Sequence, residues 1–194
     1  RDAAALDREC PKGAIHQGFV AEVTDFKYSD LDDILALAEE RGEPPFIVLL
    51  DGVEDPHNLG AIIRVAECAG VHGIVIPKHR SVSVNDTVVK VSSGAAQYMR
   101  VAKVTNINDA IKYLQERGVW VFAADMDGSD IYSANLSGAI AFVVGGEGSG
   151  VSRLTRELCD GIVALPMRGK VNSLNASVAA GIVIYEKLRR SIAK

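Results

Sequence analysis

The chain contains short apolar runs that lack the alternation expected of a strand with one face in water. Residues 46–50 read FIVLL and residues 139–144 read AIAFVV. A strand that is apolar on both faces must be covered on both sides, which is typical of a parallel sheet between two layers of helices. The sequence therefore predicts an α/β fold in which a mostly parallel sheet carries helices on both faces.

Helical patterns separate these runs. In residues 58–69, apolar residues recur at positions 59, 62, 63 and 66, which is the spacing of one helix face. One predicted helix begins within 29–32 and ends before Gly42, and the others span 58–69, 86–98, 107–117, 152–159 and 174–190. The predicted strands span 14–23, 46–50, 73–76, 101–104, 119–124, 139–144 and 162–165.

The length of 194 residues leaves room for one such domain and a short extension. We expect residues 46–194 to form the domain and residues 14–45 to form an N-terminal extension. The chain begins with Arg1 rather than Met. Residues 1–13 are therefore expected to be a linker from a preceding domain that is missing here.

The composition disfavours several classes of protein. No apolar run approaches the roughly 20 residues of a membrane-spanning helix. The three cysteines form no CxxC pair, and the four histidines show no spacing typical of a metal site. We therefore expect no membrane partner, no metal, and a reducing cytoplasmic compartment.

The net charge of −4 weakly disfavours a nucleic-acid partner, because proteins that bind nucleic acids usually carry excess positive charge. The distribution of charge matters more than its sum. Basic residues gather at 78–80 (KHR), and again at Arg168 and Lys170. A basic rim on an acidic body is therefore compatible with the sequence.

Polar residues collect in three loops that follow predicted strands. Because ligands bind at the carboxyl edge of an open α/β sheet, such loops are candidates for a binding site. In the first loop, residues 51–60, Asn58 either caps the following helix or is left for a ligand. Arg64 avoids the apolar face of that helix, and it is either solvated or binds a phosphate group.

The second loop, residues 145–150, reads GGEGSG. It matches neither the GxGxxG pattern of dinucleotide-binding proteins nor a P-loop, and it does not make Ser149 a hydrolase nucleophile. Its glycines allow either a simple flexible turn or close approach of the backbone to a ligand. Glu147 favours a ligand that is cationic or rich in hydrogen-bond donors, because a carboxylate repels phosphate.

The third loop, residues 165–177, reads LPMRGKVNSLNAS. Asn172, Ser173 and Asn175 are rival N-caps for the last helix, and since one cap suffices, the others are left for a ligand or a partner. Small residues follow at 176–181, where Gly181 costs about 1 kcal/mol relative to alanine. Either close packing against a backbone or ligand, or ordinary packing of the helix on the sheet, would account for them.

With these loops the chain resembles the SpoU/TrmH branch of the SPOUT RNA methyltransferases. The resemblance covers residues 46–194 and rests on 51–70 (DGVEDPHNLGAIIRVAECAG), 144–150 (VGGEGSG) and 165–177, in the order and spacing of that family. Residues 15–18 (IHQG) resemble a segment of the enzymes that methylate a guanosine 2′-hydroxyl in large-subunit ribosomal RNA. Those enzymes carry a small N-terminal RNA-binding domain, which would be the domain missing here.

The resemblance implies a fold that general topology rules would exclude, because knots are essentially absent from proteins. The family threads its C-terminal segment into a trefoil knot, and S-adenosylmethionine binds in the knotted loops. The resemblance also implies RNA as the substrate and a homodimer whose active site lies near the subunit interface.

Eight residues receive roles from the resemblance. The residues that would contact the methyl donor are Gly145, Leu165 and Leu174. The positions implicated in catalysis are Asn58, Arg64, Glu147, Ser173 and Asn175. We interpret Arg64 as a residue that binds the RNA phosphate and so orients the ribose, because a guanidinium with a pKa above ~12 is a poor base. Glu147 would help to order the site, and Asn172 departs from the serine expected at its position.

Three alternatives stay open at this point. The substrate could be transfer RNA instead of ribosomal RNA. A nicotinamide-dependent oxidoreductase on a Rossmann sheet is disfavoured by the absence of GxGxxG. A catalytically silent RNA-binding module is disfavoured because Asn58, Arg64, Glu147 and Asn175 are present together.

Overall fold

The computed structural model describes residues 26–148, 150–171 and 173–192, together with Ala4, Ala5, Arg8 and Cys10. The predicted strand 14–23, which includes the segment 15–18, lies outside these residues, and so does most of the expected linker. Ser149 and Asn172 also lie outside them.

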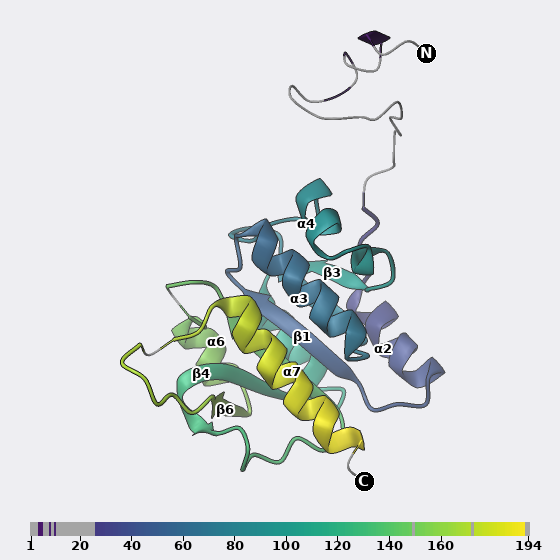
Figure 1. Cartoon of the computed structure of the whole chain (residues 1–194). Helices are drawn as coiled ribbons and strands as arrows, with labels where there is room; N and C mark the ends of the chain where they lie inside the picture. The colour runs from purple at the N-terminus through teal and green to yellow at the C-terminus, as the bar shows by residue number, and fades with distance from the viewer. Residues whose placement is uncertain are drawn as a thin grey trace.

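Six strands form one sheet in the order β3-β2-β1-β5-β4-β6 (Figure 1). They are β1 (Phe46–Asp51), β2 (Gly73–Pro77), β3 (Val101–Val104), β4 (Trp120–Asp130), β5 (Ile140–Gly145) and β6 (Gly161–Ala164). Neighbouring strands of this sheet pair in parallel. The predicted mostly parallel sheet is therefore confirmed.

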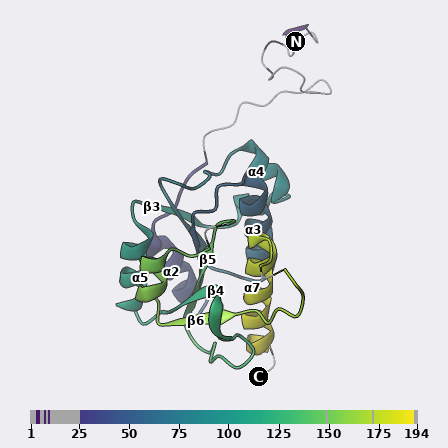
Figure 2. The same cartoon turned by 90° about the vertical axis from the view of Figure 1, so that its left-hand side faces the viewer.

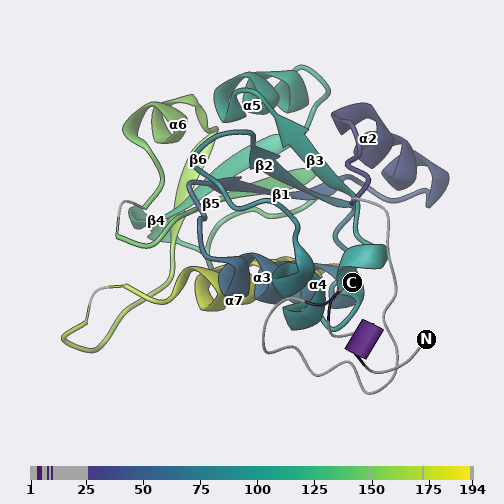
Figure 3. The ribbon, with the colours of Figure 1, turned by 90° about the horizontal axis from the view of Figure 1, so that it is seen from above.

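Helices cover both faces of the sheet, as predicted (Figure 2; Figure 3). One face carries α3 (Pro56–Cys68), α4 (Asp86–Val91), the 3-10 helix η1 (Ala95–Gln97) and α7 (Ala176–Ile192). The other face carries α2 (Leu31–Glu40), α5 (Ile107–Gln115) and α6 (Arg153–Leu158). None of the helices in the described ranges is long and apolar enough to cross a membrane.

Two apolar cores, one on each face of the sheet, explain why the strands lack alternation. Along β1, Val48 and Leu50 belong to the core beneath α3 and α7, whereas Ile47 and Leu49 belong to the core beneath α2 and α5. All four side chains are fully buried. Burial of each contributes roughly 1.5–3 kcal/mol, so both helix layers hold β1 in place.

The prediction of one helix over 86–98 is wrong. Asn85 caps α4 by accepting a hydrogen bond from the Val88 amide at 3.0 Å. Soon afterwards Ser93 and Gly94 take positive φ angles of 52° and 85°, which an α-helix cannot contain. The helix therefore stops, and the chain makes the separate turn η1.

Strand β4 is longer than predicted because it resumes after a bulge. Ala124 pairs with Val163 of β6, and Ser129 pairs with the same residue after the register shift. Residues 125–128 are pushed out of the ladder, and bulges of this kind often re-aim side chains beside functional sites. Gly128 passes so close to β6 that a Cβ atom there would lie 2.6 Å from the Val163 carbonyl carbon.

The strand order reverses between β1 and β5. From β1 the chain proceeds through β2 to β3 on one side, whereas β5, β4 and β6 lie on the other side. In open α/β sheets, ligands bind at the carboxyl ends of the strands beside such a reversal. The three polar loops begin at this edge, because they follow β1, β5 and β6.

Candidate active site

Asn58 lies inside the first turn of α3 and does not cap the helix. The cap is Asp55, whose Oδ1 atom accepts a hydrogen bond from the His57 amide at 2.9 Å, and Pro56 is the first helical residue. Asn58 is only 5% exposed. The capping interpretation of Asn58 is therefore wrong, and its buried amide requires partners outside the helix.

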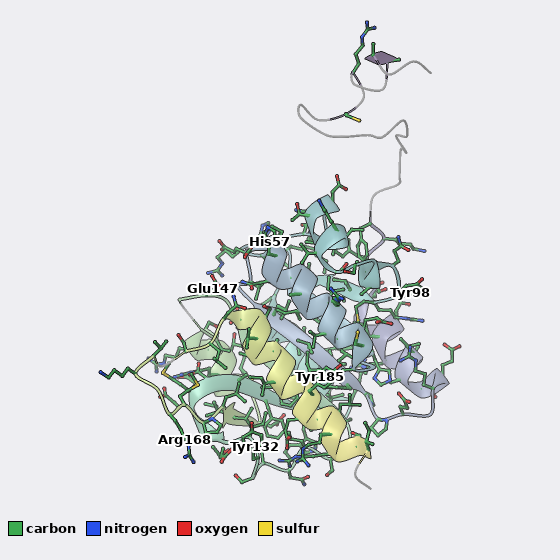
Figure 4. All side chains as sticks on the ribbon, viewed as in Figure 1. His57, Tyr98, Tyr132, Glu147, Arg168 and Tyr185 are labelled. Atoms are coloured by element: carbon green, nitrogen blue, oxygen red, sulfur yellow. The ribbon has the colours of Figure 1, made fainter. Side chains whose placement is uncertain are left out.

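Those partners come from the other two loops. Asn58 Nδ2 donates a hydrogen bond to Glu147 Oε1 at 2.9 Å, and Asn175 Nδ2 donates to the same oxygen at 2.7 Å. Asn175 Nδ2 also donates to Asn58 Oδ1 at 3.0 Å, which closes a ring of three side chains. Figure 4 shows Glu147 beside the first turn of α7. The three polar loops therefore meet at one place.

Asn175 serves the helix and the ring at once. Its Oδ1 atom accepts hydrogen bonds from the amides of Ser177 at 2.9 Å and Val178 at 3.3 Å, so Asn175 caps α7. Because Oδ1 is held by these amides, Nδ2 points away from the helix and toward Glu147. Of the rival caps that the sequence offers, Asn175 is therefore used, and it also lines the cavity.

The loop that carries Glu147 is tightly packed and is not an open turn. A Cβ atom on Gly145 would lie 2.0 Å from the Gly150 carbonyl carbon, and one on Gly146 would lie 1.9 Å from a carbonyl oxygen of the first loop. The Gly146 amide donates to the Asp51 carbonyl at 2.9 Å. These glycines are therefore required by backbone packing, which holds the chain on the N-terminal side of Glu147.

A cavity of about 550 Å³ opens at the carboxyl ends of β4, β5 and β6. This volume is typical of small-molecule sites. Six of the eight predicted site residues line it, namely Gly145, Glu147, Leu165, Ser173, Leu174 and Asn175. Asn58 adjoins the cavity through its hydrogen bonds to Glu147 and Asn175, whereas Arg64 is not part of the lining.

The lining of this cavity is acidic and apolar. Asp125 and Glu147 contribute carboxylates, and no basic side chain of the described residues lines the cavity. Apolar side chains of Val144, Leu165 and Leu174 form other parts of the wall. Such a site suits a ligand that combines an apolar part with positive charge, and it disfavours a pyrophosphate group. In the described ranges, no group of three or more His, Cys, Asp or Glu side chains could hold a metal ion.

Sequence reasoning missed Asp125 and Met126, which also line the cavity. Both belong to the β4 bulge, which turns them out of the ladder. A signal was present, since Asp125 directly follows the predicted end of a strand at the ligand-binding edge. Its Oδ1 atom lies 3.3 Å from Nη1 of Arg156 on α6.

Basic side chains lie outside the cavity. Arg64 is exposed on α3, almost two turns after Asn58, and forms no hydrogen bond or ion pair with the described part of the chain. Residues 78–80 are exposed and follow β2 at the same edge of the sheet. The Val82 amide donates to the Val53 carbonyl at 3.0 Å, which ties this basic turn to the first loop.

A shallow groove of about 920 Å³ lies between α3 and α7. Val65, Tyr132, Val178 and Tyr185 are among its lining residues, and Figure 4 shows Tyr185 on the outer side of α7. A Cβ atom on Gly181 would lie 3.7 Å from Val65 Cγ1, an ordinary contact distance. An alanine would therefore fit at position 181, which agrees with ordinary packing of α7 and does not require a glycine there.

The sequence and the fold are similar to those of RNA methyltransferases. A model described as the SpoU rRNA Methylase family matches residues 45–185. YacO of Bacillus subtilis, whose name assigns it to the TrmH family of tRNA and rRNA methyltransferases, is 49% identical over 177 residues. That match covers 90% of this chain and 71% of YacO. The 23S rRNA (guanosine-2′-O-)-methyltransferase RlmB of Vibrio parahaemolyticus is 48% identical over 185 residues, which cover 93% of this chain and 73% of RlmB.

A solved structure shows the same fold. The SpoU methyltransferase AviRb from Streptomyces viridochromogenes, crystallised with the cofactor AdoMet, superposes with a TM-score of 0.77 at 28% identity. The superposition covers 87% of this chain and 67% of AviRb. The family model spans all three polar loops, and the two relatives are almost half identical to the chain. The chain therefore belongs to the SpoU rRNA methylase family.

Proposed function

We propose that the chain transfers a methyl group from S-adenosylmethionine to a ribose 2′-hydroxyl of RNA, with a guanosine of large-subunit ribosomal RNA as its target. The observation that carries this proposal is the ring of Asn58, Glu147 and Asn175 beside an acidic cavity. The relative RlmB is named for this reaction on 23S rRNA, and AviRb was crystallised with the methyl donor.

The residues that line the cavity fit this donor. When bound, S-adenosylmethionine supplies a methyl group on a positively charged sulfonium sulfur. The carboxylates of Asp125 and Glu147 favour that charge, while Leu165 and Leu174 offer apolar surface for an adenine ring, and Gly145 adds backbone polar groups. A nicotinamide dinucleotide would bring two phosphate groups toward the same carboxylates, which disfavours the oxidoreductase alternative.

Methyl transfer requires a 2′-hydroxyl that is held in line and loses its proton. We assign the grip on the neighbouring phosphate to Arg64, because its guanidinium is exposed and always carries positive charge. Glu147 accepts two charge-assisted hydrogen bonds on Oε1. Its assigned role is to hold the site in order between the methyl donor and the methyl acceptor. Ser173, on the cavity wall, offers a hydroxyl group to the acceptor.

A homodimer that forms through the groove between α3 and α7 is part of the same proposal. Tyr132, Val178 and Tyr185 are 53%, 49% and 48% exposed, and apolar patches of this kind often mark an interface. The N-terminal ends of the two helices carry Asn58 and Asn175. A dimer at this groove would bring the ring of one subunit close to its partner, as the family resemblance implies.

We also propose that the C-terminal segment forms the trefoil knot of the family. The loop before α7 supports this, because Leu174 and Asn175 line the same cavity as Gly145 and Gly146 of the loop before α6. Two loops from different parts of the chain thus share one ligand site. This arrangement agrees with the expectation that the donor binds in the knotted loops.

Incubation of the full chain with RNA and methyl-labelled S-adenosylmethionine tests the proposal. We expect label at a ribose 2′-oxygen of ribosomal RNA after digestion and mapping, and none in transfer RNA. Label in transfer RNA alone would instead support the alternative substrate. Calorimetric titration should show binding of S-adenosylmethionine and none of NAD. Binding of NAD without any methyl transfer would contradict the proposal.

A further inference from the structure

We infer that Asp125 recognises the positive charge of the methyl donor and so lets the cavity distinguish the donor from its demethylated product. The inference rests on the proposed function and adds a specificity-determining residue to it. Transfer of the methyl group leaves a neutral thioether in place of the sulfonium, so donor and product differ in charge at one sulfur atom. A carboxylate in the cavity wall can detect that difference by Coulomb attraction alone.

The β4 bulge places Asp125 in the cavity wall. Residues 125–128 leave the ladder with β6, and Asp125 becomes part of the cavity lining while its side chain stays only 12% exposed. Its Oδ2 atom lies 3.5 Å from the position that a Cβ atom on Gly150 would take. The carboxylate is therefore held between the bulge and the end of the glycine-rich loop.

The charges around Asp125 leave a negative excess at this wall. Arg156 Nη1 lies 3.3 Å from Asp125 Oδ1 and 3.3 Å from Asp127 Oδ2, so one cation is shared by two carboxylates. Asp127 is 71% exposed and does not line the cavity, so water screens its charge more strongly. Of the two carboxylates that share Arg156, Asp125 therefore contributes more to the field inside the cavity.

Glu147, the other carboxylate of the lining, is less suited to this task. Its Oε1 atom already accepts hydrogen bonds from Asn58 and Asn175, and the residue is exposed. Amide donors on a carboxylate oxygen reduce the negative potential that a ligand experiences. Asp125 therefore recognises the charge of the donor, whereas Glu147 orders the site.

Equilibrium titrations of the full chain with three ligands test this inference. The ligands are S-adenosylmethionine, S-adenosylhomocysteine, and sinefungin, which carries an ammonium group in place of the sulfonium. We expect Asp125→Asn to raise the dissociation constants of S-adenosylmethionine and sinefungin by about tenfold. The dissociation constant of S-adenosylhomocysteine should rise by less than about twofold. The affinity ratio of donor to product, measured without turnover, should therefore fall by about tenfold.

Glu157→Gln is the matched control, because it removes one carboxylate from the same helix as Arg156, whereas Glu157 pairs with Arg153 and lies outside the cavity lining. This variant should change the donor-to-product ratio by less than about twofold. Arg156→Gln removes the counter-charge and should raise the ratio, which provides a test even if Asp125→Asn fails to fold. The inference is overturned if Asp125→Asn weakens the binding of all three ligands equally, or if Arg156→Gln leaves the affinity ratio of donor to product unchanged. If the wild-type chain bound none of the three ligands, the proposed function itself would fail.

Discussion

Asn175 Nδ2 lies 2.7 Å from Glu147 Oε1 and donates a hydrogen bond to it, while the Oδ1 atom of the same asparagine caps α7. One side chain thus fixes the start of a helix and one corner of the candidate site. The two roles use different atoms of the amide group. They can therefore be separated by substitutions that keep one atom and remove the other.

Asn175→Ser keeps a capping oxygen and removes the amide donor, whereas Asn175→Ala removes both. We expect both variants to lose methyl transfer by at least about tenfold, because either change leaves Glu147 without its shorter hydrogen bond. Only Asn175→Ala should also lose about 1 kcal/mol of unfolding free energy through the missing cap. Urea denaturation and initial rates measure the two effects. Full activity of Asn175→Ser would contradict a role for the Glu147 contact.

Arg64→Lys should separate acceptor binding from donor binding. Arg64 is not part of the cavity lining, so the dissociation constant of S-adenosylmethionine should change by less than about twofold. The rate of methyl transfer should fall by at least about tenfold, because lysine keeps the charge and loses the planar two-point grip on a phosphate. Calorimetry and single-turnover kinetics provide the two measurements. A lysine variant with wild-type rates would mean that bidentate contact is not required.

The exposed basic turn at 78–80 is expected to contact the RNA backbone. Joint substitution of Lys78 and Arg80 by alanine should weaken RNA binding and lower the salt dependence of log K by about 1–2 units, since each phosphate contact releases counterions. Binding of S-adenosylmethionine should not change. Joint substitution of Arg41 and Lys112, which are exposed near the opposite helix layer, is the control with the same change of charge. Equal salt slopes for the two double variants would contradict the assignment.

Tyr185→Glu should dissociate the proposed dimer, because it places a charge on the apolar groove between α3 and α7. We expect the dimer dissociation constant to rise about thirtyfold or more. Sedimentation velocity over a range of concentrations measures the shift. Tyr98→Glu is a suitable control, since Tyr98 is 77% exposed and follows η1, away from the groove. An unchanged dimer in Tyr185→Glu would place the interface elsewhere.

Glu186 makes stability depend on acidic pH. Hydrogen bonds from Arg189 and, less strongly, Arg190 lower the pKa of Glu186 from 4.5 to about 2, although burial acts in the opposite direction. Because the pKa is lower in the folded state, this contribution to stability is complete above about pH 4.5. It is lost as the pH falls toward 2.

Urea denaturation across this pH range measures the effect. Glu186→Gln should cost about 2 kcal/mol at pH 7 and much less near pH 2, where the wild-type carboxylate also becomes neutral. Glu157→Gln is the control, because Glu157 pairs with Arg153 in one exposed contact and should contribute less than about 0.5 kcal/mol. A constant difference between Glu186→Gln and wild type across the range would contradict this account.

The strands were predictable from the sequence because the two cores leave a local pattern. Each residue of the run 46–50 is buried on one face or the other, so the run is continuously apolar. The β4 bulge leaves no such pattern, because its residues 125–128 (DMDG) have the composition of a turn. Its second pairing with β6 depends on residues more than thirty positions later, which local reasoning does not reach.

The meeting of the three polar loops was also predictable, because loops after parallel strands share one edge of the sheet. Which residue caps each helix was not. Asp55 and Asn58 are both good caps, and the hydrogen bond from the His57 amide to Asp55 in the folded helix shows that Asp55 is used. Asp125 was not predicted as a site residue for a related reason. A single aspartate after a strand is a weak signal, and it is the bulge that places Asp125 in the cavity wall.

The ring joins residues that the ribosome adds at very different times. Asn58 and Asn175 are 117 positions apart, and their contact closes only when α7 has docked against α3. A protein whose synthesis stops before residue 175 would keep the loop after β1 and lack the amide that completes the ring. Prematurely terminated products of this gene should therefore be unable to transfer a methyl group, even if they keep the basic residues that are expected to contact RNA.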